Sequence, residues 1–344
     1  MPEYRFSVII PSYNRAEEVI DLLQSLQAQT FEHDRFEVLI IDDGSTDETE
    51  QKVKELSSLI DFHWRFFRRD HEGPGPARNF GMSQAKGEYF LFIDSDCLAH
   101  AEWLKEIDSA IAHEAPQAFG GPDSVLANFS PLQKAIDYSM TSFLTTGGMR
   151  GHSKKPLAKF YPRSFNMGIS REIYGKLGGM GNLRHGQDIE FSRRIVASGA
   201  KVIYIPTAIV YHKRRTSLRK FFRQMFNWGV ARINLSYFDK GNLEPLHFIP
   251  AIATVGYILL TLLTLLTGWT LEIWLGITGL ALLICIGIFI HSSIKYHSLK
   301  VGWLTPIISV CQVFAYGLGF TINFIRRKIF RRGKYIGFTR KYYE

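Results

Sequence analysis

Two carboxylates separated by one residue follow a short apolar run, and their side chains could hold a divalent cation. Asp94 and Asp96 come directly after residues 89–93, which are apolar enough for a buried strand. Hard oxygen ligands of this kind suit Mg²⁺ or Mn²⁺ that bridges a diphosphate. A helix cap or a solvated turn is the alternative, because Asp is common in both. The pair predicts a metal site without establishing one.

A second acidic turn, at residues 42–47, follows another apolar run and could hold a nucleotide. A carboxylate of Asp42 or Asp43 could accept a hydrogen bond from a nucleobase N–H. Gly44 could adopt a backbone conformation that other residues resist. An Asx turn that also caps the next helix is the alternative, and both interpretations can hold together.

One arginine near the start of a predicted helix could bind phosphate. Residues 73–79 read Gly-Pro-Gly-Pro-Ala-Arg-Asn, and Arg78 occupies the position of the third glycine of a dinucleotide-binding fingerprint. The prolines also lack the backbone donors that would bind pyrophosphate, which argues against a dinucleotide-dependent dehydrogenase. We interpret Arg78 as a cation for phosphates, with an ordinary surface ion pair as the alternative.

A further acid, Asp188, stands in the first turn of a predicted amphipathic helix and follows a glycine-rich stretch. Its carboxylate could take a proton from an attacking hydroxyl. The helix dipole favours an acid at this position in any case, which is the alternative without a catalytic role.

Strands and helices alternate along the first part of the chain, and this order would bring these residues together. We predict strands at 5–11, 36–41, 62–67 and 89–93, with helices at 16–29, 48–59 and 77–85 between them. The alternation is typical of an α/β domain with a parallel sheet and helices on both faces. Ligands of such sheets bind beyond the carboxyl ends of the strands, where the polar turns at 11–15, 42–45 and 94–96 stand.

The composition changes near residue 245, where three apolar segments without charged residues begin. Residues 248–267, 273–290 and 301–325 are each about long enough to cross a hydrocarbon core of ~30 Å. Three buried helices of a soluble domain are the alternative, although such helices normally show a polar face. Residues 217–235 are typical of an amphipathic helix in the lipid interface, with an ordinary buried helix as the alternative.

The net charge of +9 is concentrated beside the apolar segments, with eight Lys/Arg in residues 326–344 and six in residues 212–223. Such clusters favour anionic or phosphorylated lipids as partners, and no motif for nucleic acid is present. Cys97, Cys285 and Cys311 show neither paired nor zinc-ligand spacing. No apolar stretch precedes the first strand, so we expect the N-terminal part to stay in the cytosol.

Five ordered motifs resemble those of inverting glycosyltransferases of family 2, which have the GT-A fold. They are PSYN at 11–14, DDGSTD at 42–47, GPGPARNFG at 73–81, DSD at 94–96 and GQDIEFSRR at 186–194. The resemblance covers roughly residues 5–215. It implies a Rossmann-like GT-A domain, a nucleotide-sugar donor, a divalent metal and transfer with inversion.

The resemblance also implies roles for the residues at matching positions. The nucleotide and donor would be bound by Pro11, Tyr13, Asn14, Asp42, Asp43, Arg78 and Asp94. Mg²⁺ or Mn²⁺ would be held by Asp96, Asp94 and His212, and Asp188 would be the catalytic base. A surface histidine in a basic loop is the alternative for His212. Gln187 replaces the more usual acid before the base, which puts a second carboxylate there in doubt.

Residues 224–228 resemble the QxxRW motif of processive polysaccharide synthases, but Asn227 stands where the arginine is expected. This departure favours addition of a single sugar over a processive synthase that exports its polymer. Four residues are further candidates for the acceptor or phosphate side, namely Gln187, Asn166, Gln224 and Trp228.

We therefore predict a multi-pass enzyme of the plasma (inner) membrane with a cytoplasmic catalytic domain at 1–215. An interfacial connector at 216–245, three apolar segments within 246–325 (about 247–268, 271–290 and 301–325) and a basic tail at 326–344 would follow. The acceptor would be a polyprenyl-linked saccharide or a surface-polysaccharide precursor.

The alternatives from other classes conflict with this sequence. An inactive scaffold of an envelope-synthesis complex would be expected to lose a motif carboxylate, and a transporter would be expected to have more spanning helices.

Three full spans that start from a cytoplasmic domain would put the basic tail outside, against the positive-inside rule. We therefore expect a re-entrant or interfacial third segment.

Overall fold

The computed structural model describes residues 2–126, 129–146, 160–181, 186–237, 241 and 243–338. The chain forms two units, and each is described by itself. Unit 1 comprises residues 1–126 and 148–213, and unit 2 comprises residues 127–147 and 214–344. Residues 127–147, which we predicted as part of the catalytic domain, thus group with the apolar C-terminal part.

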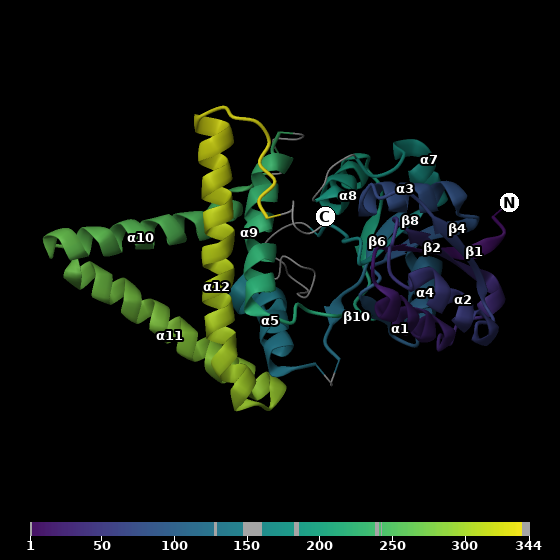
Figure 1. Cartoon of the computed structure of the whole chain (residues 1–344), viewed down its shortest axis with the longest axis horizontal. Coiled ribbons are helices and arrows are strands. Elements are labelled where there is room, and N and C mark those ends of the chain that lie inside the picture. Colours follow the sequence, from purple (N-terminus) through teal and green to yellow (C-terminus); the bar gives the residue numbers. More distant parts are fainter. Residues whose placement is uncertain are drawn as a thin grey trace. The chain divides into compact units, whose positions relative to one another are not determined.

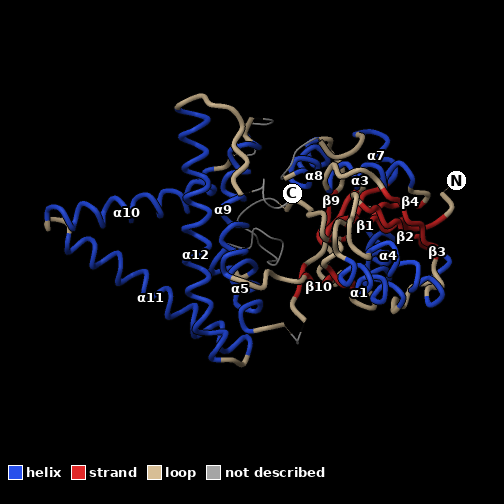
Figure 2. Tube along the Cα trace, in the orientation of Figure 1, coloured by secondary structure: helices blue, strands red, loops and turns tan. Residues whose placement is uncertain are grey.

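A seven-stranded sheet forms the centre of unit 1 (Figure 2). Its order is β3 (His63–Arg68), β2 (Phe36–Asp42), β1 (Tyr4–Ser12), β4 (Gly87–Ile93), β8 (Asn166–Ser170), β6 (Ala118–Gly120) and β9 (Val202–Tyr204). The first four strands are parallel, as the alternation of strands and helices predicts. β8 runs antiparallel to both β4 and β6, which the alternation of strands and helices does not predict.

Helices cover both faces of this sheet, as predicted (Figure 1). Alternate residues of a strand point to opposite faces, so Val8 of β1 packs in one apolar core and Ile9 in the other. One face is covered by α1 (Ala16–Gln27), α2 (Thr49–Leu56) and α4 (Trp103–Glu114). The other is covered by α3 (Pro74–Gln84), α7 (Arg171–Leu177) and α8 (Gln187–Ala197).

A second, three-stranded sheet joins three short segments that lie far apart in the sequence. β10 (Val210–His212) runs antiparallel to β5 (Cys97–Ala99) and parallel to β7 (Asp123–Ser124). In this register His212 lies opposite Cys97, the residue that follows Asp96. The sheet therefore brings His212 to the turn that contains the paired carboxylates.

Unit 2 is helical among its described residues. It contains α5 (Pro131–Thr141), α6 (Phe143–Thr146), α9 (Leu218–Leu235), α10 (Ile249–Thr267), α11 (Leu271–Tyr296) and α12 (Leu299–Phe324), with a 3₁₀ turn at Pro245–Phe248 and a π turn at Ile325–Ile329. Its core joins α5, α9 and α12. Three stretches are long and apolar enough to cross a membrane, namely Pro245–Thr267, Leu271–Tyr296 and Leu299–Ile329.

Two predictions made from the sequence concern the helices α9 and α12 of unit 2. The apolar face of α9, including Phe221 and Met225, packs against α5 and α12, as in the alternative of a buried helix. α12 is continuous from Leu299 to Phe324 despite Pro306, which contradicts the re-entrant form of the expected third segment and leaves its interfacial form a prediction. Residues 238–240 and 242 of the predicted connector, and residues 339–344 of the tail, lie outside the described residues.

Candidate functional site

The carboxyl ends of neighbouring strands bring the predicted nucleotide-binding residues of unit 1 together. Ser12 at the end of β1 pairs in register with Asp42 at the end of β2, and Pro11 pairs with Ile41 one step before. Ser12 and Asp42 are buried, with 3% and 1% of their surface exposed. The Ser45 N–H donates a hydrogen bond to Asp42 Oδ2 at 3.1 Å. Asp42 Oδ1 and Ser12 Oγ have no hydrogen-bond partner among the described residues.

This unpaired acceptor indicates a place for a ligand. A buried polar atom without a partner costs free energy, and native structures contain few of them. Burial also raises the pKa of the Asp42 carboxyl, because the charged form loses contact with water. An N–H group of a nucleobase would satisfy Asp42 Oδ1, which is the role the sequence predicts.

Replacing Asp42 with Asn is expected to weaken nucleotide binding by about tenfold or more, the effect of losing one hydrogen bond to a charged group. The carboxylate can accept from Ser45 with one oxygen and from the ligand with the other, whereas Asn has a single oxygen. Calorimetric titration with nucleoside diphosphates measures the effect. Asp34→Asn, at an exposed position, is the control. Equal affinity of Asp42→Asn and the unmodified protein would remove Asp42 from the site.

Asp43 and Asn14 organise the loops around this position. Asp43 accepts hydrogen bonds from the Glu72 N–H at 2.9 Å and the Gly73 N–H at 2.8 Å. Asn14 has a positive φ of 50°, accepts from the Thr46 N–H at 2.8 Å and donates its own N–H to Ser45. Asn tolerates this backbone region better than most residues. Both side chains are thus engaged within the fold beside Asp42.

An aromatic pair lies next to these loops. The rings of Tyr13 and His71 are stacked, with centroids 4.1 Å apart. His71 Nδ1 also lies 2.8 Å from Asp43 Oδ2. Aromatic rings are suitable surfaces for a nucleobase, because every base has a π face. Tyr13 thus lies beside the loops around Asp42, together with His71, and its contact with a nucleotide stays a prediction.

Arg78 and Asp94 form an ion pair at the start of α3. Arg78 is 6% exposed, and its Nη2 donates a hydrogen bond to Asp94 Oδ1. Arg78 Nε is buried without a hydrogen-bond partner among the described residues. The pair is therefore not an ordinary surface ion pair, the alternative considered from the sequence. A buried guanidinium with an unpaired donor fits the predicted role in binding phosphate.

Gln187 packs against the same helix. A Cβ atom on Gly75 would lie only 2.2 Å from Gln187 Nε2, so a larger residue at position 75 would displace this side chain. Gln187 is 7% exposed and is the first residue of α8. The missing side chain of Gly75 thus lets the start of α8 approach the start of α3.

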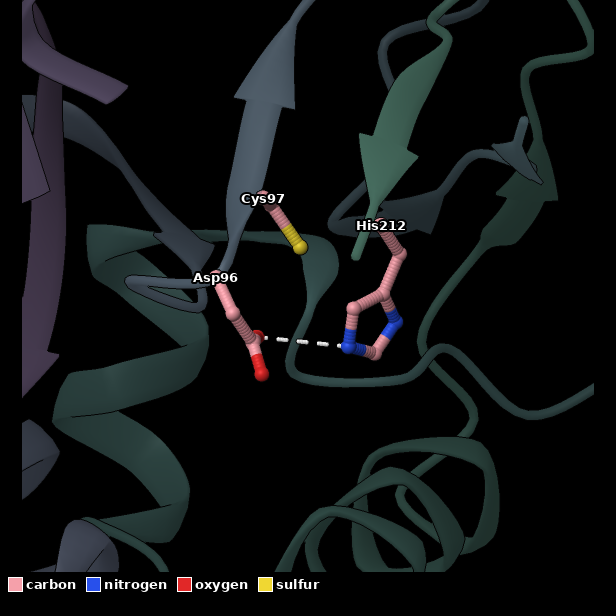
Figure 3. A group of neighbouring side chains, drawn as sticks. All are labelled: Asp96, Cys97 and His212. Carbon is pink, nitrogen blue, oxygen red and sulfur yellow. Dashed lines mark ion pairs between the residues drawn. The ribbon is translucent and has the colours of Figure 1, made fainter. Parts of the chain in front are cut away.

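Asp96, Cys97 and His212 form a cluster that could hold a metal ion (Figure 3). One ligand atom from each residue lies within 4.8 Å of the others. His212 Nε2 is 3.2 Å from Asp96 Oδ1, and the Arg15 guanidinium donates a hydrogen bond to Asp96 Oδ2 at 2.9 Å. On the far side of the ring, His212 Nδ1 is 3.7 Å from Asp123 Oδ2.

The chemistry of this cluster fits a divalent cation. A carboxylate and an imidazole are ligands that Mn²⁺ accepts, and a second carboxylate behind the imidazole fixes the ring orientation. Asp123 is in the right place for that supporting role. The Cys97 thiol is a softer ligand than Mg²⁺ or Mn²⁺ prefers. Asp94, predicted as a further ligand, is instead paired with Arg78 and lies outside this group.

Asp188 lies in the first turn of α8, where the sequence predicts it. Its side chain is 22% exposed, and its Oδ2 is 3.8 Å from Arg163 Nη1. Gly186, at the start of the helix, has a φ of 76°, a region that glycine adopts without strain. The carboxylate is thus accessible to solvent and lies near the guanidinium of Arg163. Residues 182–185, just before the motif, lie outside the described residues.

Three further residues were predicted for the acceptor or phosphate side, namely Asn166, Gln224 and Trp228. Asn166 is 3% exposed; its amide donates to the Pro122 and Ala208 carbonyls and its Oδ1 accepts from Trp103. These hydrogen bonds join the segments that contain Trp103, Pro122 and Ala208, and they use both polar atoms of the Asn166 side chain. An acceptor role for Asn166 stays a prediction. Gln224 and Trp228 lie on α9 in unit 2, and their acceptor role stays a prediction.

Four residues of the site were missed from the sequence: Ser12, Arg15, His71 and Asp123. Ser12 ends β1 and Arg15 lies in the polar segment just after it, so position alone could have indicated them. His71 precedes the glycine-rich stretch by two residues. Asp123 carries no local signal, because only the pairing of β7 with β10 brings it to His212.

The chain is similar to known proteins over much of its length. The family model for Glycosyl transferase family 2 matches residues 7–178, which is half of the chain. The glycosyltransferase AglE of Haloferax volcanii is 26% identical over 254 residues, which cover 73% of this chain and 81% of AglE.

Two further proteins are similar to most of the chain. A dolichyl N-acetyl-α-D-glucosaminyl phosphate 3-β-D-2,3-diacetamido-2,3-dideoxy-β-D-glucuronosyltransferase of Methanococcus voltae is 24% identical over 255 residues, covering 71% of this chain and 78% of that protein. The structure of the mannosyltransferase PcManGT from Pyrobaculum calidifontis, in complex with GDP-Man and Mn²⁺, has a TM-score of 0.67 at 18% identity and covers 93% of this chain and 86% of PcManGT. At that identity the structural likeness shows the fold.

Proposed function

The chain belongs to glycosyl transferase family 2, and from this premise we propose an inverting transfer of one sugar from a nucleotide-diphosphate donor to a membrane-associated acceptor. The protein is a glycosyltransferase that acts on nucleotide sugars, and unit 1 is a GT-A-like domain. The observation that carries the proposal is the gathering of Asp42, Asp94 and Asp96 at the carboxyl ends of β2 and β4, the strands that flank β1.

The donor would lie along this edge of the sheet. Asp42 Oδ1 would accept from the nucleobase, beside the ring of Tyr13, and Arg78 would bind a phosphate oxygen. Asp96 and His212 would hold Mg²⁺ or Mn²⁺. A cation bound there would neutralise charge that develops on the departing diphosphate. PcManGT was solved with Mn²⁺, and GT-A glycosyltransferases commonly use divalent metals.

Asp188 would act as the general base. An acceptor hydroxyl that attacks the anomeric carbon must lose a proton, and a single carboxylate on the face opposite the leaving group suffices for one inverting displacement. Asp94 and Asp96 are committed to Arg78 and to the metal cluster. Asp42 is buried beneath the proposed nucleobase, and Asp43 is bonded to the loop at 72–73. Of the two further motif acids, Glu190 is paired with Arg194, and Asp47 accepts hydrogen bonds from the Ala16 and Thr49 N–H groups. Asp188 is the motif carboxylate left for this task.

The acceptor would be lipid-linked or a surface-polysaccharide precursor. The name of the Methanococcus voltae relative states a dolichyl phosphate-linked acceptor. The three apolar stretches of unit 2 would keep the enzyme in the membrane where such acceptors reside. The basic residues at 326–334 would interact with anionic lipids there.

The location that fits this chemistry is the plasma (inner) membrane, with unit 1 in the cytoplasm. Nucleotide sugars are made in the cytosol of the cell. Basic segments next to membrane spans are retained on the cytoplasmic side. The clusters at 213–223 and 326–334 therefore favour this orientation.

A transfer assay tests the proposal. Membranes that contain the protein are incubated with labelled nucleotide sugars, one donor at a time, with Mn²⁺ or with excess chelator. Label from one donor is expected to enter a product that organic solvent extracts, and the chelator is expected to prevent this. Absence of transfer from every donor, with nucleotide binding intact, would reject the proposal.

A further inference from the structure

The helices α10 and α11 form a hairpin within unit 2. Residues 268–270 join them at one end, where the Thr264 and Thr270 hydroxyls lie 2.6 Å apart. At the open end each helix reaches α12, but at a different place (Figure 1). The start of α10 packs on the C-terminal half of α12. The Thr254 hydroxyl lies 3.2 Å from the Val313 carbonyl, and the Phe248 and Phe320 rings are 5.0 Å apart.

The end of α11 packs on the opposite end of α12. The rings of Phe289 and Trp303 have centroids 4.9 Å apart. A rise of about 1.5 Å per residue puts Trp303 and Phe320 about 25 Å apart along α12. α12 therefore lies across the open end of the hairpin.

This geometry decides which helices cross the bilayer. If α10 and α11 both cross, the start of the first and the end of the second lie at the same membrane surface. α12 touches both of these ends, so it must run along that surface rather than through the core. We propose that α10 and α11 form a spanning hairpin and that α12 lies in the lipid–water interface, although it is long and apolar enough to span.

The burial of the three helices supports this assignment over the reverse. In the most apolar window of α10 and α11 only 11% and 6% of residues are buried, against 39% for α12. A helix that is apolar all round suits the hydrocarbon core, whereas a helix with one exposed apolar stripe suits an interface. The exposed large apolar residues of α12 and its extension recur at helical spacing in two groups, one at Leu299, Trp303, Ile307 and Val310 and one at Ile322, Ile325 and Ile329, and the residues between the groups are less exposed.

The other faces of α12 are covered by protein. α9 packs closely along it, since a Cβ on Gly229 would lie 2.2 Å from the Tyr316 carbonyl oxygen. Asn323 donates hydrogen bonds to the Val230 carbonyl and to Asn234 Oδ1. Ser139 of α5 donates to Gln312 Oε1 at 2.8 Å. The exposed apolar residues therefore form the side of α12 that can contact lipid.

The basic segment after α12 returns along α9. Asn234 Nδ2 donates to the Tyr335 carbonyl at 2.7 Å, and the Phe338 N–H donates to Asn227 Oδ1 at 2.9 Å. The basic segment thus lies at the same membrane surface as α9 and α12, where its cations can contact anionic headgroups.

A depth measurement tests the arrangement. Single cysteines at Trp303→Cys, Val310→Cys and Ile322→Cys sample the exposed stripe of α12, in a full-length background that carries Cys285→Ala and Cys311→Ala. Cys97 is fully buried and is kept. Each cysteine carries an environment-sensitive fluorophore, and the protein is reconstituted into phosphatidylcholine and phosphatidylglycerol vesicles. Quenching by lipids with a spin label near the headgroup is compared with quenching by lipids with a label deep in the acyl chain.

All three α12 positions are expected to report the same shallow depth. The matched control is α11, where Ile273→Cys and Ile290→Cys should be shallow and Leu283→Cys deep. A deep Val310 between shallow Trp303 and Ile322 would mean that α12 crosses the membrane and would overturn the proposal. Shallow values throughout α11 would overturn it too, because the hairpin would not be inserted.

Discussion

Replacing Asp188 with Asn is expected to lower kcat by about 10²-fold or more, with donor affinity nearly unchanged. Asn keeps the size of the side chain at the start of α8 but has almost no basicity. The attacking hydroxyl then loses the group that takes its proton. Arg163, 3.8 Å from Asp188 Oδ2, would lose its charged partner, but Asp188 is 22% exposed and water compensates. Steady-state kinetics and calorimetric titration of the donor measure the two quantities.

The control for this variant is Glu172→Gln in the first turn of α7. It also removes one acid from the start of a helix in unit 1, at an exposed position. Near-normal turnover is expected there. If Asp188→Asn lost only donor affinity, Asp188 would be a binding residue, and if it turned over normally the base would lie elsewhere.

The second large effect is expected from Asp96→Asn, which should reduce turnover by about 10²-fold or more. Unlike Asp188→Asn, it should also weaken binding of Mn²⁺ by the protein alone, which electron paramagnetic resonance measures from the free ion. Asp96 supplies the charged ligand of the cluster, and the neutral imidazole of His212 cannot replace that charge. The two variants thus separate loss of the base from loss of the metal.

Stability should change little in Asp96→Asn. Arg15 loses the charge of Asp96 but keeps a second acidic neighbour, because its Nη1 lies 3.9 Å from Glu18 Oε1 and 28% of its side chain is exposed to water. A thermal melt checks that the variant is folded. Asp34→Asn, on the exposed turn before β2, should behave like the unmodified protein in both assays. Full activity of the unmodified protein in excess chelator would contradict the role given to Asp96.

Much of unit 1 could be predicted because its signals are local. The apolar runs of β1, β2 and β4 are buried on both faces of a parallel sheet, and such strands read as continuous apolar stretches. Parallel strands end at the same edge, so the polar turns after them had to meet. Asp42, Asp94 and Asp96 were found for this reason.

Features that depend on distant pairing could not be predicted. β8 runs antiparallel next to β4, and nothing in its five residues indicates direction. Asp123 reaches His212 only because β7 pairs with β10. The structural contacts of Asn166 could not be predicted for a related reason. Its amide joins the carbonyls of Pro122 and Ala208, more than forty residues away on either side.

In unit 2, composition alone could not predict how the apolar helices are arranged. Residues 299–329 are long and apolar enough to span, and only the contacts at both ends of α12 distinguish a helix across the membrane from one along it. Likewise, α5 is an ordinary amphipathic helix by sequence. Its packing on α9 and α12 assigns it to unit 2.

The mass spectrum of the product is the most direct test of the central claim. The protein is reconstituted in vesicles with a polyprenyl-linked saccharide extract, Mn²⁺ and the donor that the transfer assay identifies. The account predicts a single mass increment of one sugar on the lipid-linked acceptor, present with the unmodified protein and absent with Asp188→Asn. A ladder of repeated increments would contradict single-sugar transfer and indicate a processive synthase. An unchanged acceptor, with the donor bound, would contradict the proposed reaction itself.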